Sequence, residues 1–541
     1  MALTAMMTTL AACSQDDEPL DAAPKLAQIE FEITDGGYGG DEATRAVEEG
    51  LRTKFEAGDE CGLYIIDDGE FIASNVKLTA EEGENGEITW KAADGAISGV
   101  TENSKYFLYY PYVSYADSRV SNALGDKDTE VFKELIANWS VYHIQSTYTS
   151  YTQSDLMTAT GTPSPETDDK LKVSFRLTHR MALAIIEVPR TVYKFTDTSI
   201  PDYVPTLVDF TVGDNFLLPY RMADGTYRCI VNPIEETYSD RCITGTITGN
   251  KKFTIPSEKL KGIDKEKYTR FVVGGGAVTE INHNLQAGDY LMKDGMLVGK
   301  DKTLTAEQKA DVAAIVFWSP AETAADGRTT PASLTDDKIM AAEHPNCNHG
   351  LAVAVKELYG DPIAWQFGAE SVENFRNSDD FTHANKGNFV SIASGTRDNI
   401  NKILGYQNTQ VLLAYNDYCY STSKIGNTVK PAESLAKFAN SNPAPTGSTG
   451  WFLPSMKELY MLYYKDVDDI YYVGSNTETS EKVNTSLTAV SGENLSDTYW
   501  SSSEYDSNSP SAFFVVIQNG QVYVGYSGKG NQKKARAVLA F

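Results

Sequence analysis

Apolar and polar residues alternate with a period of two through most of the first half of the chain. The segment "AQIEFEI" at residues 27–33 alternates cleanly, and "LKVSFRL" places Val173, Phe175 and Leu177 on one face. This alternation is typical of strands with one buried face. The continuous apolar run "MALAIIEV" at residues 181–188 instead predicts a strand that is buried on both faces. Because Gly, Asp, Asn and Pro separate these short segments, we expect all-β sandwiches here.

The pattern changes after residue 285, where clear helical signals begin. "PAESLAKFAN" begins with Pro431, which suits the first turn of a helix, and its apolar residues recur at helical spacing. Ser455 with Glu458 three residues later predicts a capping box, and "TAEQ" from Thr305 predicts another. Strand patterns return at the end of the chain, so this last part is predicted to be an α+β domain.

The length of 541 residues requires more than one core, because single cores stop growing at about 250–300 residues. A hydrophobic content of 41% is enough for packed cores. We therefore predict a multidomain fold of two or three domains, with all-β sandwiches followed by an α+β domain. The expected divisions are a leader and acidic linker at 1–24, the all-β part at 25–284 and the α+β domain at 285–541.

The first residues have the layout of a secretory leader. "MALTAMMTTLAAC" is short and apolar, and it ends in small residues just before Cys13. "LAAC" resembles a bacterial lipobox, in which the cysteine is lipidated. The following "SQDDE" resembles the signal that sends lipoproteins of Bacteroidetes to the outer face of the outer membrane. We expect a lipid on Cys13 to be the membrane contact, since no stretch reaches the roughly 18 apolar residues of a spanning helix. The alternative is an ordinary disordered N-terminus.

"TRA" at residues 44–46 opens a series of short motifs, followed by "FEAGDECGLYI", "YFLYYPY" and "VSFRLTHRMALAIIEV". In this order the motifs resemble the fimbrillin family of Bacteroidetes. The resemblance implies two transthyretin-like β-sandwiches, at 25–190 and 191–284, in a pilin or pilus-related surface lipoprotein. It also implies that an Arg-directed protease trims the first strand at Arg45, so that a neighbouring pilin subunit can supply a strand. The alternative is that Arg45 is an ordinary surface residue.

A second set of motifs lies in the C-terminal part. "GDYLMKDGMLV", "AAIVFW", "GWFLPSMKELYML", "YWSSSEY" and "KARAVLAF" resemble C-type-lectin-fold domains, the class shared by formylglycine-generating-enzyme-like proteins. They are most similar to the variable proteins of diversity-generating retroelements. In that family the last strands and loops form a binding surface whose codons are rewritten, while the frame around it stays constant. The resemblance implies a ligand-binding domain with a variable region at residues 498–541.

The closing stretch from Thr498 begins and ends with apolar residues, which we call its frame, and is polar and rich in Tyr between them. Trp500 on one side and "ARAVLAF" on the other are core-type residues, whereas Tyr, Ser, Asn, Asp and Gly are frequent between them. Aromatic anchors among small polar residues are the composition of a paratope. The alternative is a polar edge hairpin without a ligand. The expected ligand-contact residues are Tyr505, Asp506, Asn508, Phe514, Val516, Tyr523, Tyr526 and Ser527.

Strand periodicity restricts which side chains of this stretch can face a ligand, because successive residues of a strand point to opposite faces. The stretch is expected to turn at Asn519-Gly520. The residues expected to face outward are Phe514, Val516 and Tyr523. The residues expected to pack inward are Phe513, Val515 and Val522.

Charge and cysteine usage narrow the classes of partner. The formal net charge is −27 with no basic block, which argues against nucleic acid as a partner.

Cys229 and Cys242 leave two alternatives open, a disulfide that closes one hairpin or buried free thiols. "HPNCNH" at residues 344–349 falls short of the four ligands of a structural zinc site, so we interpret it as a surface loop. No metal or other cofactor is expected.

These features favour a binding protein over an enzyme. The formylglycine-generating enzymes of this fold use a late cysteine pair, whereas Cys419 is the last cysteine here and stands alone. The first hypothesis is a lipid-anchored surface adhesin or receptor that presents a variable C-type-lectin-like domain on a fimbrillin-like stalk. Its ligand would be a protein or glycan on another cell or on a phage. The second hypothesis is a structural pilus tip or terminating subunit, joined to pilin subunits by strand exchange. The third is a glycan-active surface enzyme.

Overall fold

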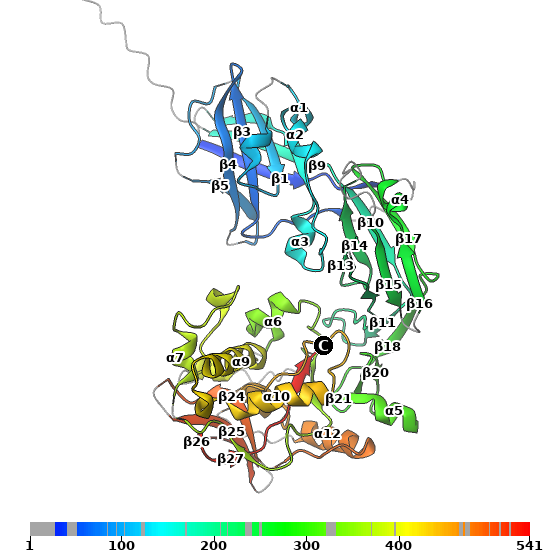
Figure 1. The fold of residues 1–541 in the computed structure, drawn as a ribbon, viewed down its shortest axis with the longest axis vertical. Helices are drawn as coiled ribbons and strands as arrows, with labels where there is room; N and C mark the ends of the chain where they lie inside the picture. Colours follow the sequence, from blue (N-terminus) through cyan, green and yellow to red (C-terminus); the bar gives the residue numbers. More distant parts are fainter. Residues whose placement is uncertain are drawn as a thin grey trace, which may run out of the picture.

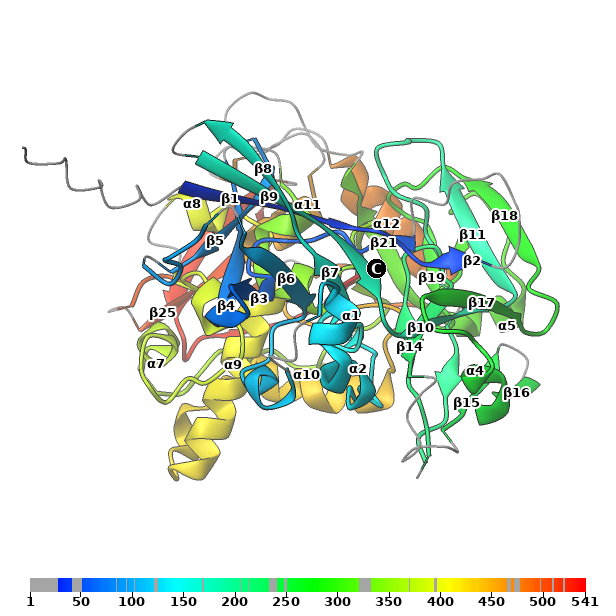
Figure 2. The same ribbon diagram turned by 90° about the horizontal axis from the view of Figure 1, so that it is seen from above.

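The computed structural model arranges the chain as three bodies along a bent path (Figure 1). Two β-rich bodies come first, and a mixed body that holds most of the helices carries the C-terminus. This last body is called the head below. Seen from above in Figure 2, the first two bodies lie side by side over the head. The structure describes residues 28–40, 51–83, 85–93, 95–101, 103–120, 125–167, 170–205, 207–213, 215–232, 241–247, 251–320, 332–368, 370–393, 397–464, 469–470, 477–496, 498–507, 510–518 and 521–541.

The first body is a β-sheet that closes on itself. Its strands run in the order β1-β5-β4-β3-β6-β7-β9-β8, and β1 also pairs in parallel with β9 along its whole length. The sequence predicted a sandwich of two sheets, but the β1–β9 pairing joins the edges into one closed sheet. Val173, Phe175 and Leu177 are buried in its core, as predicted. The strands are β1 (Gln28–Asp35), β3 (Glu60–Asp67), β4 (Glu70–Glu82), β5 (Ile88–Ala92), β6 (Lys105–Tyr110), β7 (Met157–Thr160), β8 (Thr162–Thr167) and β9 (Lys170–His179).

A second apolar cluster joins the first body to the next. Tyr64 and Phe107 come from strands of the first sheet, whereas Leu183, Ile185 and Ile230 come from the second body. Short helices contribute to the same cluster, and Figure 1 shows the last of them between the two bodies. The two bodies are therefore packed together through a shared apolar interface. The helices are α1 (Asp128–Val131), α2 (Lys133–Ala137) and α3 (Tyr148–Thr152).

The second body contains two sheets, in the orders β13-β14-β10-β17-β2 and β12-β15-β16, around a common core. β10 is buried over nearly its whole length, as its apolar run predicted. Because β10 pairs with β14 and β17, the chain enters this body upstream of the predicted division after residue 190. Its elements are β2 (Gly39–Gly40), β10 (Ala182–Glu187), β12 (Asp209–Phe210), β13 (Tyr220–Arg221), β14 (Tyr227–Val231), β15 (Ile243–Ile247), β16 (Lys251–Ile255), α4 (Ser257–Lys261) and β17 (Lys267–Val272).

Cys229 and Cys242 do not form the hairpin disulfide that the sequence left open as one alternative. Both are free thiols. Cys229 lies in β14 and Cys242 directly precedes β15, and these two strands belong to different sheets. Burial raises the pKa of the Cys229 thiol, which makes it a poor nucleophile. The other alternative, free thiols, is the one that the structure has.

A parallel two-stranded ribbon carries the chain from the second body to the head. It consists of β11 (Arg190–Phe195) and β18 (Val278–His283). Tyr193 of β11 donates a hydrogen bond to the carbonyl oxygen of Leu297 at 2.9 Å. Tyr203, which follows β11, donates to the carbonyl oxygen of Gly295 at 2.7 Å. Residues that precede position 285 in the sequence are therefore part of the head core.

The "HPNCNH" segment is part of this junction and not the surface loop that we predicted. Cys347 and His349 are buried. The ring nitrogens of His349 lie 3.2 Å from the carbonyl oxygen of Phe541 and 3.1 Å from that of Asp202. The last residue of the chain and the segment after β11 thus meet at one histidine.

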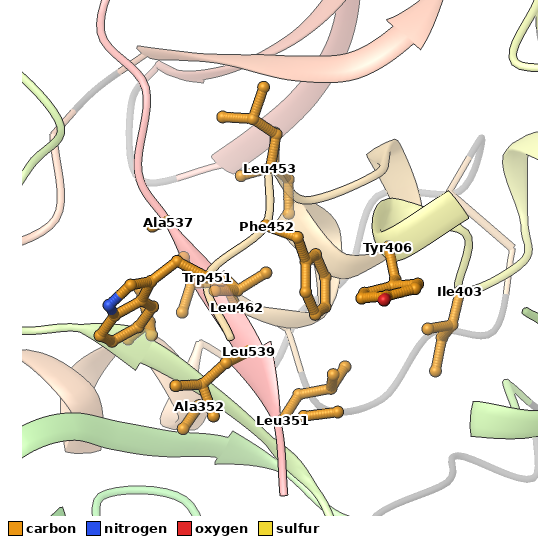
Figure 3. Close-up of a cluster of buried hydrophobic side chains, with 14 of the residues drawn as sticks. Leu351, Ala352, Ile403, Tyr406, Trp451, Phe452, Leu453, Leu462, Ala537 and Leu539 are labelled. Carbon is orange, nitrogen blue, oxygen red and sulfur yellow. The ribbon is translucent and has the colours of Figure 1, made fainter. Parts of the chain in front are cut away.

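The head combines a five-stranded sheet, in the order β20-β19-β21-β22-β28, with the three-stranded sheet β24-β25-β26. Figure 3 shows part of its core, in which Phe452 lies between Leu539 of β28 and Tyr406 of α9. The elements are β19 (Tyr290–Met292), β20 (Leu297–Val298), α5 (Ala306–Asp311), β21 (Val312–Trp318), α6 (Lys338–Glu343), β22 (Leu351–Ala354), β23 (Ile363–Ala364), α7 (Val372–Arg376), α8 (Arg397–Ile400), α9 (Gly405–Ser421), α10 (Lys430–Ser441), α11 (Met456–Met461), α12 (Glu478–Ala489), β24 (Thr498–Glu504), β25 (Ser511–Gln518), β26 (Gln521–Gly528), β27 (Gln532–Lys533) and β28 (Val538–Ala540).

Three helix starts in the head were predicted correctly. Pro431 lies in the first turn of α10, and Thr305 and Ser455 cap α5 and α11 with both hydrogen bonds of a capping box. The 17-residue helix α9, which packs against α6, α7, α10 and β24, was not predicted. Among the described residues, no helix has both the length and the apolar character needed to cross a membrane.

Candidate ligand-contact surface of the head

Several of the predicted positions lie outside the residues that the structure describes. They are Cys13, Arg45, Asn508 and the expected turn at Asn519-Gly520. The other predicted contact residues lie on or beside the three-stranded sheet of the head.

The frame around the Tyr-rich stretch is buried, as predicted. Trp500 is fully buried, and its indole N–H donates to the carbonyl oxygen of Ile363 at 3.0 Å. The guanidinium of Arg536, which is also fully buried, donates to the carbonyl oxygens of Ala354 and Glu493 at 2.8 Å each. These contacts satisfy polar groups that would otherwise be costly to bury. They fix the strands on both sides of the stretch.

The hairpin of β25 and β26 divides the predicted contact residues between its two faces. The residues expected to pack inward are all buried: Phe513, Val515 and Val522. Phe513 lies opposite Tyr526, and Val516 lies opposite Tyr523. Directly opposed residues of an antiparallel pair point to the same face. Tyr526 therefore shares the face of Phe513, whereas Tyr523 shares the other face with Val516, and the predicted residues do not form one continuous patch.

Tyr505 and Tyr526 form an aromatic stack on the inner face of the hairpin. Their ring centroids are 4.0 Å apart with an interplanar angle of 26°. Tyr505 also contacts the buried Phe513, with centroids 5.4 Å apart. Tyr526 remains 57% exposed. The stack therefore holds an exposed ring in a defined position.

On the opposite face, the ring of Phe514 is already covered. Lys533 Nζ lies 3.8 Å from the ring centroid, and the Trp500 ring meets it edge to face at 6.0 Å. A Cβ atom on Gly525 would lie only 2.6 Å from the Phe514 ring, so a larger residue does not fit opposite it. Phe514 packs against the frame, and Tyr523, 38% exposed, remains accessible.

The polar members of the predicted set are less accessible than the tyrosines. Asp506 and Ser527 are half-buried, as is the apolar Val516. The hydroxyl oxygen of Ser527 is buried, so it does not face solvent. Of the residues that the sequence singled out, Tyr523 and Tyr526 are the exposed ones in the described part of the stretch.

A buried ion pair lies at the end of the hairpin, and it was not predicted from the sequence. Lys529 Nζ pairs with the carboxylate of Glu504, and both side chains are almost completely buried. Glu504 also accepts hydrogen bonds from the backbone N–H groups of Val372 at 3.0 Å and Glu373 at 2.8 Å. Lys529 makes a second bond to the carbonyl oxygen of Glu370 at 2.8 Å. Glu504 and Lys529 thereby hold the start of α7 against the hairpin.

A groove of about 490 Å³ lies beside this ion pair, between α7, α9 and the segment after β24. We call it the α7–α9 groove. Its volume falls within the range of small-molecule sites. Among the described residues, no group of three or more His, Cys, Asp or Glu could hold a metal ion. Residues that line the groove include Glu370, Asn374, Asp380, Tyr418, Lys424 and Ser507.

Comparisons with known proteins extend over the whole architecture. A family profile described as "Fimbrillin-like" matches residues 44–211. A Bacteroides ovatus protein named "Putative fimbrium tip subunit Fim1C" is 30% identical over 566 residues, covering 98% of this chain and 96% of that protein. The crystal structure of a fimbrial protein from Bacteroides ovatus is 27% identical with a TM-score of 0.52, and it covers 95% of this chain and 100% of that chain. The crystal structure of a "putative cell adhesion protein" from Bacteroides uniformis is 17% identical with a TM-score of 0.27, over 47% of this chain and 93% of that chain.

Proposed function

The chain belongs to the fimbrillin-like family, and from this premise we propose that it is a fimbrium tip subunit whose head adheres to an external surface. The relative that matches nearly the whole chain is named as a fimbrium tip subunit, and the likeness includes the head. A fimbrium subunit works at the cell surface. A subunit at the tip is the first to meet another cell, which suits a binding role for the body farthest along the chain.

The observation that carries the adhesive role is the pair of exposed tyrosines on a firmly supported hairpin. Tyr526 is stacked on Tyr505, and strand β25 of the hairpin is paired with β24, which carries the buried Trp500. Rigid aromatic side chains supply contact area at low entropic cost. A terminating subunit without a ligand has no need of such a surface, so we prefer the adhesin to the purely structural alternative.

Changing Tyr523 and Tyr526 together to alanine is expected to weaken binding of the full chain to its target cells by about 30-fold or more. Contact anchors typically contribute about 2 kcal/mol or more, and every 1.4 kcal/mol is about tenfold in affinity. The melting temperature should stay nearly unchanged, because exposed side chains usually alter stability by about 0.5 kcal/mol or less. Cell-binding titration and thermal unfolding measure the two quantities.

Tyr142→Ala is the matched control, since Tyr142 is also about half exposed, at 51%, but lies outside the head. It should bind like the unchanged chain. Equal binding by the double variant and this control would mean that Tyr523 and Tyr526 are not the contact, and absence of cell binding by the unchanged chain would favour the terminating-subunit alternative. Unfolding of the double variant would mean that the two tyrosines stabilise the head and would remove the main support for the adhesive role.

The finer fold assignments belong to the same proposal. The first body, with its closed sheet, and the second body, with its two sheets, would be variants of the transthyretin-like domain of the family. The head would be C-type-lectin-like, which agrees with the terminal strand β28 lying in one sheet with β19 and β20, the first strands of the head. In this proposal the surface at residues 498–541 is the part that diversifies. Its ligand would be a protein or glycan on another cell or on a phage.

Attachment to the outer membrane through Cys13 and trimming at Arg45 complete the proposal. The support for Cys13 is the "LAAC" string and the acidic residues after it. Mass spectrometry of protein purified from the native membrane is expected to find a multiply acylated cysteine at the new N-terminus, since one acyl chain binds membranes only marginally. An unmodified Cys13 in the mature protein would contradict the lipid anchor.

A further inference from the structure

The α7–α9 groove has a lining that suits an uncharged polar ligand. Lys424 Nζ lies 3.3 Å from each carboxylate oxygen of Glu370, so these two charges neutralise each other. The hydroxyl of Tyr415 also donates to Glu370 at 3.4 Å. An anion entering the groove would meet Glu370 and Asp380, and an apolar ligand would desolvate these polar groups without replacing their water.

One wall of the groove is aromatic. The Phe375 ring centroid lies 5.4 Å from that of Tyr415 and 5.2 Å from that of Tyr418. Lys424 lies over the Tyr418 ring at 5.5 Å. Phe375 and Tyr415 are buried and support Tyr418, which is half-buried and supplies the accessible apolar surface beside a polar tip. Sugar rings carry both kinds of surface, since their C–H faces pack on aromatic rings while their hydroxyls donate and accept hydrogen bonds.

The mouth of the groove offers polar groups for such hydroxyls. Asp380 is exposed at the edge, and no other residue in the described ranges forms a hydrogen bond or ion pair with it. Asn374 is also exposed. Its side-chain amide donates a hydrogen bond to the carbonyl oxygen of Ser507, on the other side of the groove, at 3.3 Å. A carboxylate acceptor and an amide at one opening match neighbouring hydroxyls of a saccharide.

The walls are held in place without a ligand. The ion pair of Glu504 and Lys529 fixes the start of α7, and Ser371 caps this helix by accepting from the N–H of Asn374 at 3.2 Å. A preformed groove loses less entropy on binding. Within 498–541, Ser507 is the lining residue, and the other walls come from residues 370–424. The groove is therefore almost independent of the Tyr-rich stretch beside it.

We infer that the α7–α9 groove is a saccharide-binding site that takes one or a few neutral sugar units of a surface glycan, on the side of the hairpin where Tyr505 and Tyr526 stack. The inference rests on the proposed function, because it names the ligand class of the same head. The groove binds the sugar itself, and the adjacent hairpin contacts the target surface around that sugar.

The test uses the full chain on a glycan array, followed by titration calorimetry with the free saccharide that gives the strongest signal. Binding to neutral saccharides is expected. Asp380→Asn and Asn374→Ala together should weaken it by roughly tenfold or more, because hydrogen bonds to charged groups contribute more than neutral ones. Asp361→Asn, at an exposed position of the head outside the groove, is the matched control and should bind normally. Thermal unfolding checks that all variants fold.

The outcomes separate this inference from the proposed function. Loss of sugar binding in the groove variant, with unchanged binding in the control and in the Tyr523 and Tyr526 double variant, supports the groove. Absence of neutral-saccharide binding, a preference for charged ligands, or equal binding by groove variant and control overturns it. If cell adhesion still depends on Tyr523 and Tyr526 in any of these cases, the adhesin proposal stands while the groove assignment falls. If the chain binds no cells at all, the adhesin proposal falls first.

Discussion

Replacing Lys529 with methionine is expected to destabilise the head by about 3–5 kcal/mol, the usual cost of removing one partner of a buried ion pair. The side chains of Lys529 and Glu504 are only 1% and 0% exposed. Methionine fills similar space but leaves the Glu504 carboxylate without its cation in a region that excludes water. The bond from Lys529 to the carbonyl oxygen of Glu370 is lost as well. Denaturant unfolding gives the free energy, and hydrogen exchange of head peptides localises the opening.

Two further variants show whether the charge is the cause. Lys302→Met changes an exposed lysine of the head and should alter stability by about 0.5 kcal/mol or less. Combining Lys529→Met with Glu504→Gln should recover part of the loss, because the amide no longer requires a cation. If Lys529→Met is as stable as Lys302→Met, the pair does not hold α7 in place. The preformed groove would then lose its main support.

The second large effect is expected in the first body, where His179→Asn should cost about 3–5 kcal/mol. The two ring nitrogens of His179 lie 2.9 Å from carboxylate oxygens of Asp35 and Asp155, and all three side chains are buried. Tyr38 stacks on the imidazole with centroids 3.7 Å apart and donates to Asp155 at 2.6 Å. Without the imidazolium, two buried carboxylates face each other. Asp35 ends β1, so hydrogen exchange of β1 should rise first.

The contribution of His179 depends on pH in a defined direction. Burial alone would lower its pKa, but Asp155 and Asp35 outweigh burial and raise the pKa to about 9 from the usual 6.5. A raised pKa stabilises the fold fully below the unfolded value, and this stability is lost as the pH rises through the folded value. The unchanged chain should therefore lose stability between about pH 6.5 and 9, and His179→Asn should lack this slope. His143→Asn, at a histidine away from these carboxylates, should keep it. An identical slope in both variants would contradict the assignment.

Features that depend on neighbours in sequence could be predicted, since their physics is local. The alternation of apolar and polar residues around Val173 indicates one buried face of β9, and the spacing of Ser455 and Glu458 indicates a helix start. The same reasoning separated Phe513 and Val515 from Phe514 on β25. Each of these inferences uses side-chain direction within one strand or the hydrogen bonds of one helix turn.

Features that depend on distant partners could not be predicted. β1 and β9 are separated by more than a hundred residues, so nothing local indicates that they pair and close the sheet. In α9 the buried positions include the polar Gln407 and Asn408, which hides the apolar periodicity of a core helix. The backbone N–H of Gln407 is satisfied by Asp337 at 2.7 Å, and the side chain of Asn408 by Ser502 at 3.2 Å. The predicted contact set was divided between two faces because strand register and the ring contacts of Phe514 and Tyr505 are also long-range properties.

The ribbon of β11 and β18 has a mechanical consequence for a protein whose head is pulled away from the rest of the chain while it is bound. Both strands run in the same direction toward the head, so a pull on the head is directed along them. The hydrogen bonds of the ladder join the two strands side by side, so a pull along them loads both strands at the same end and does not open the ladder bond by bond. Tyr203, buried in the head beyond the end of β11, gives this strand a second anchor besides the covalent path through β18. Tension on the head is shared by two strands, which makes this link resistant to tearing.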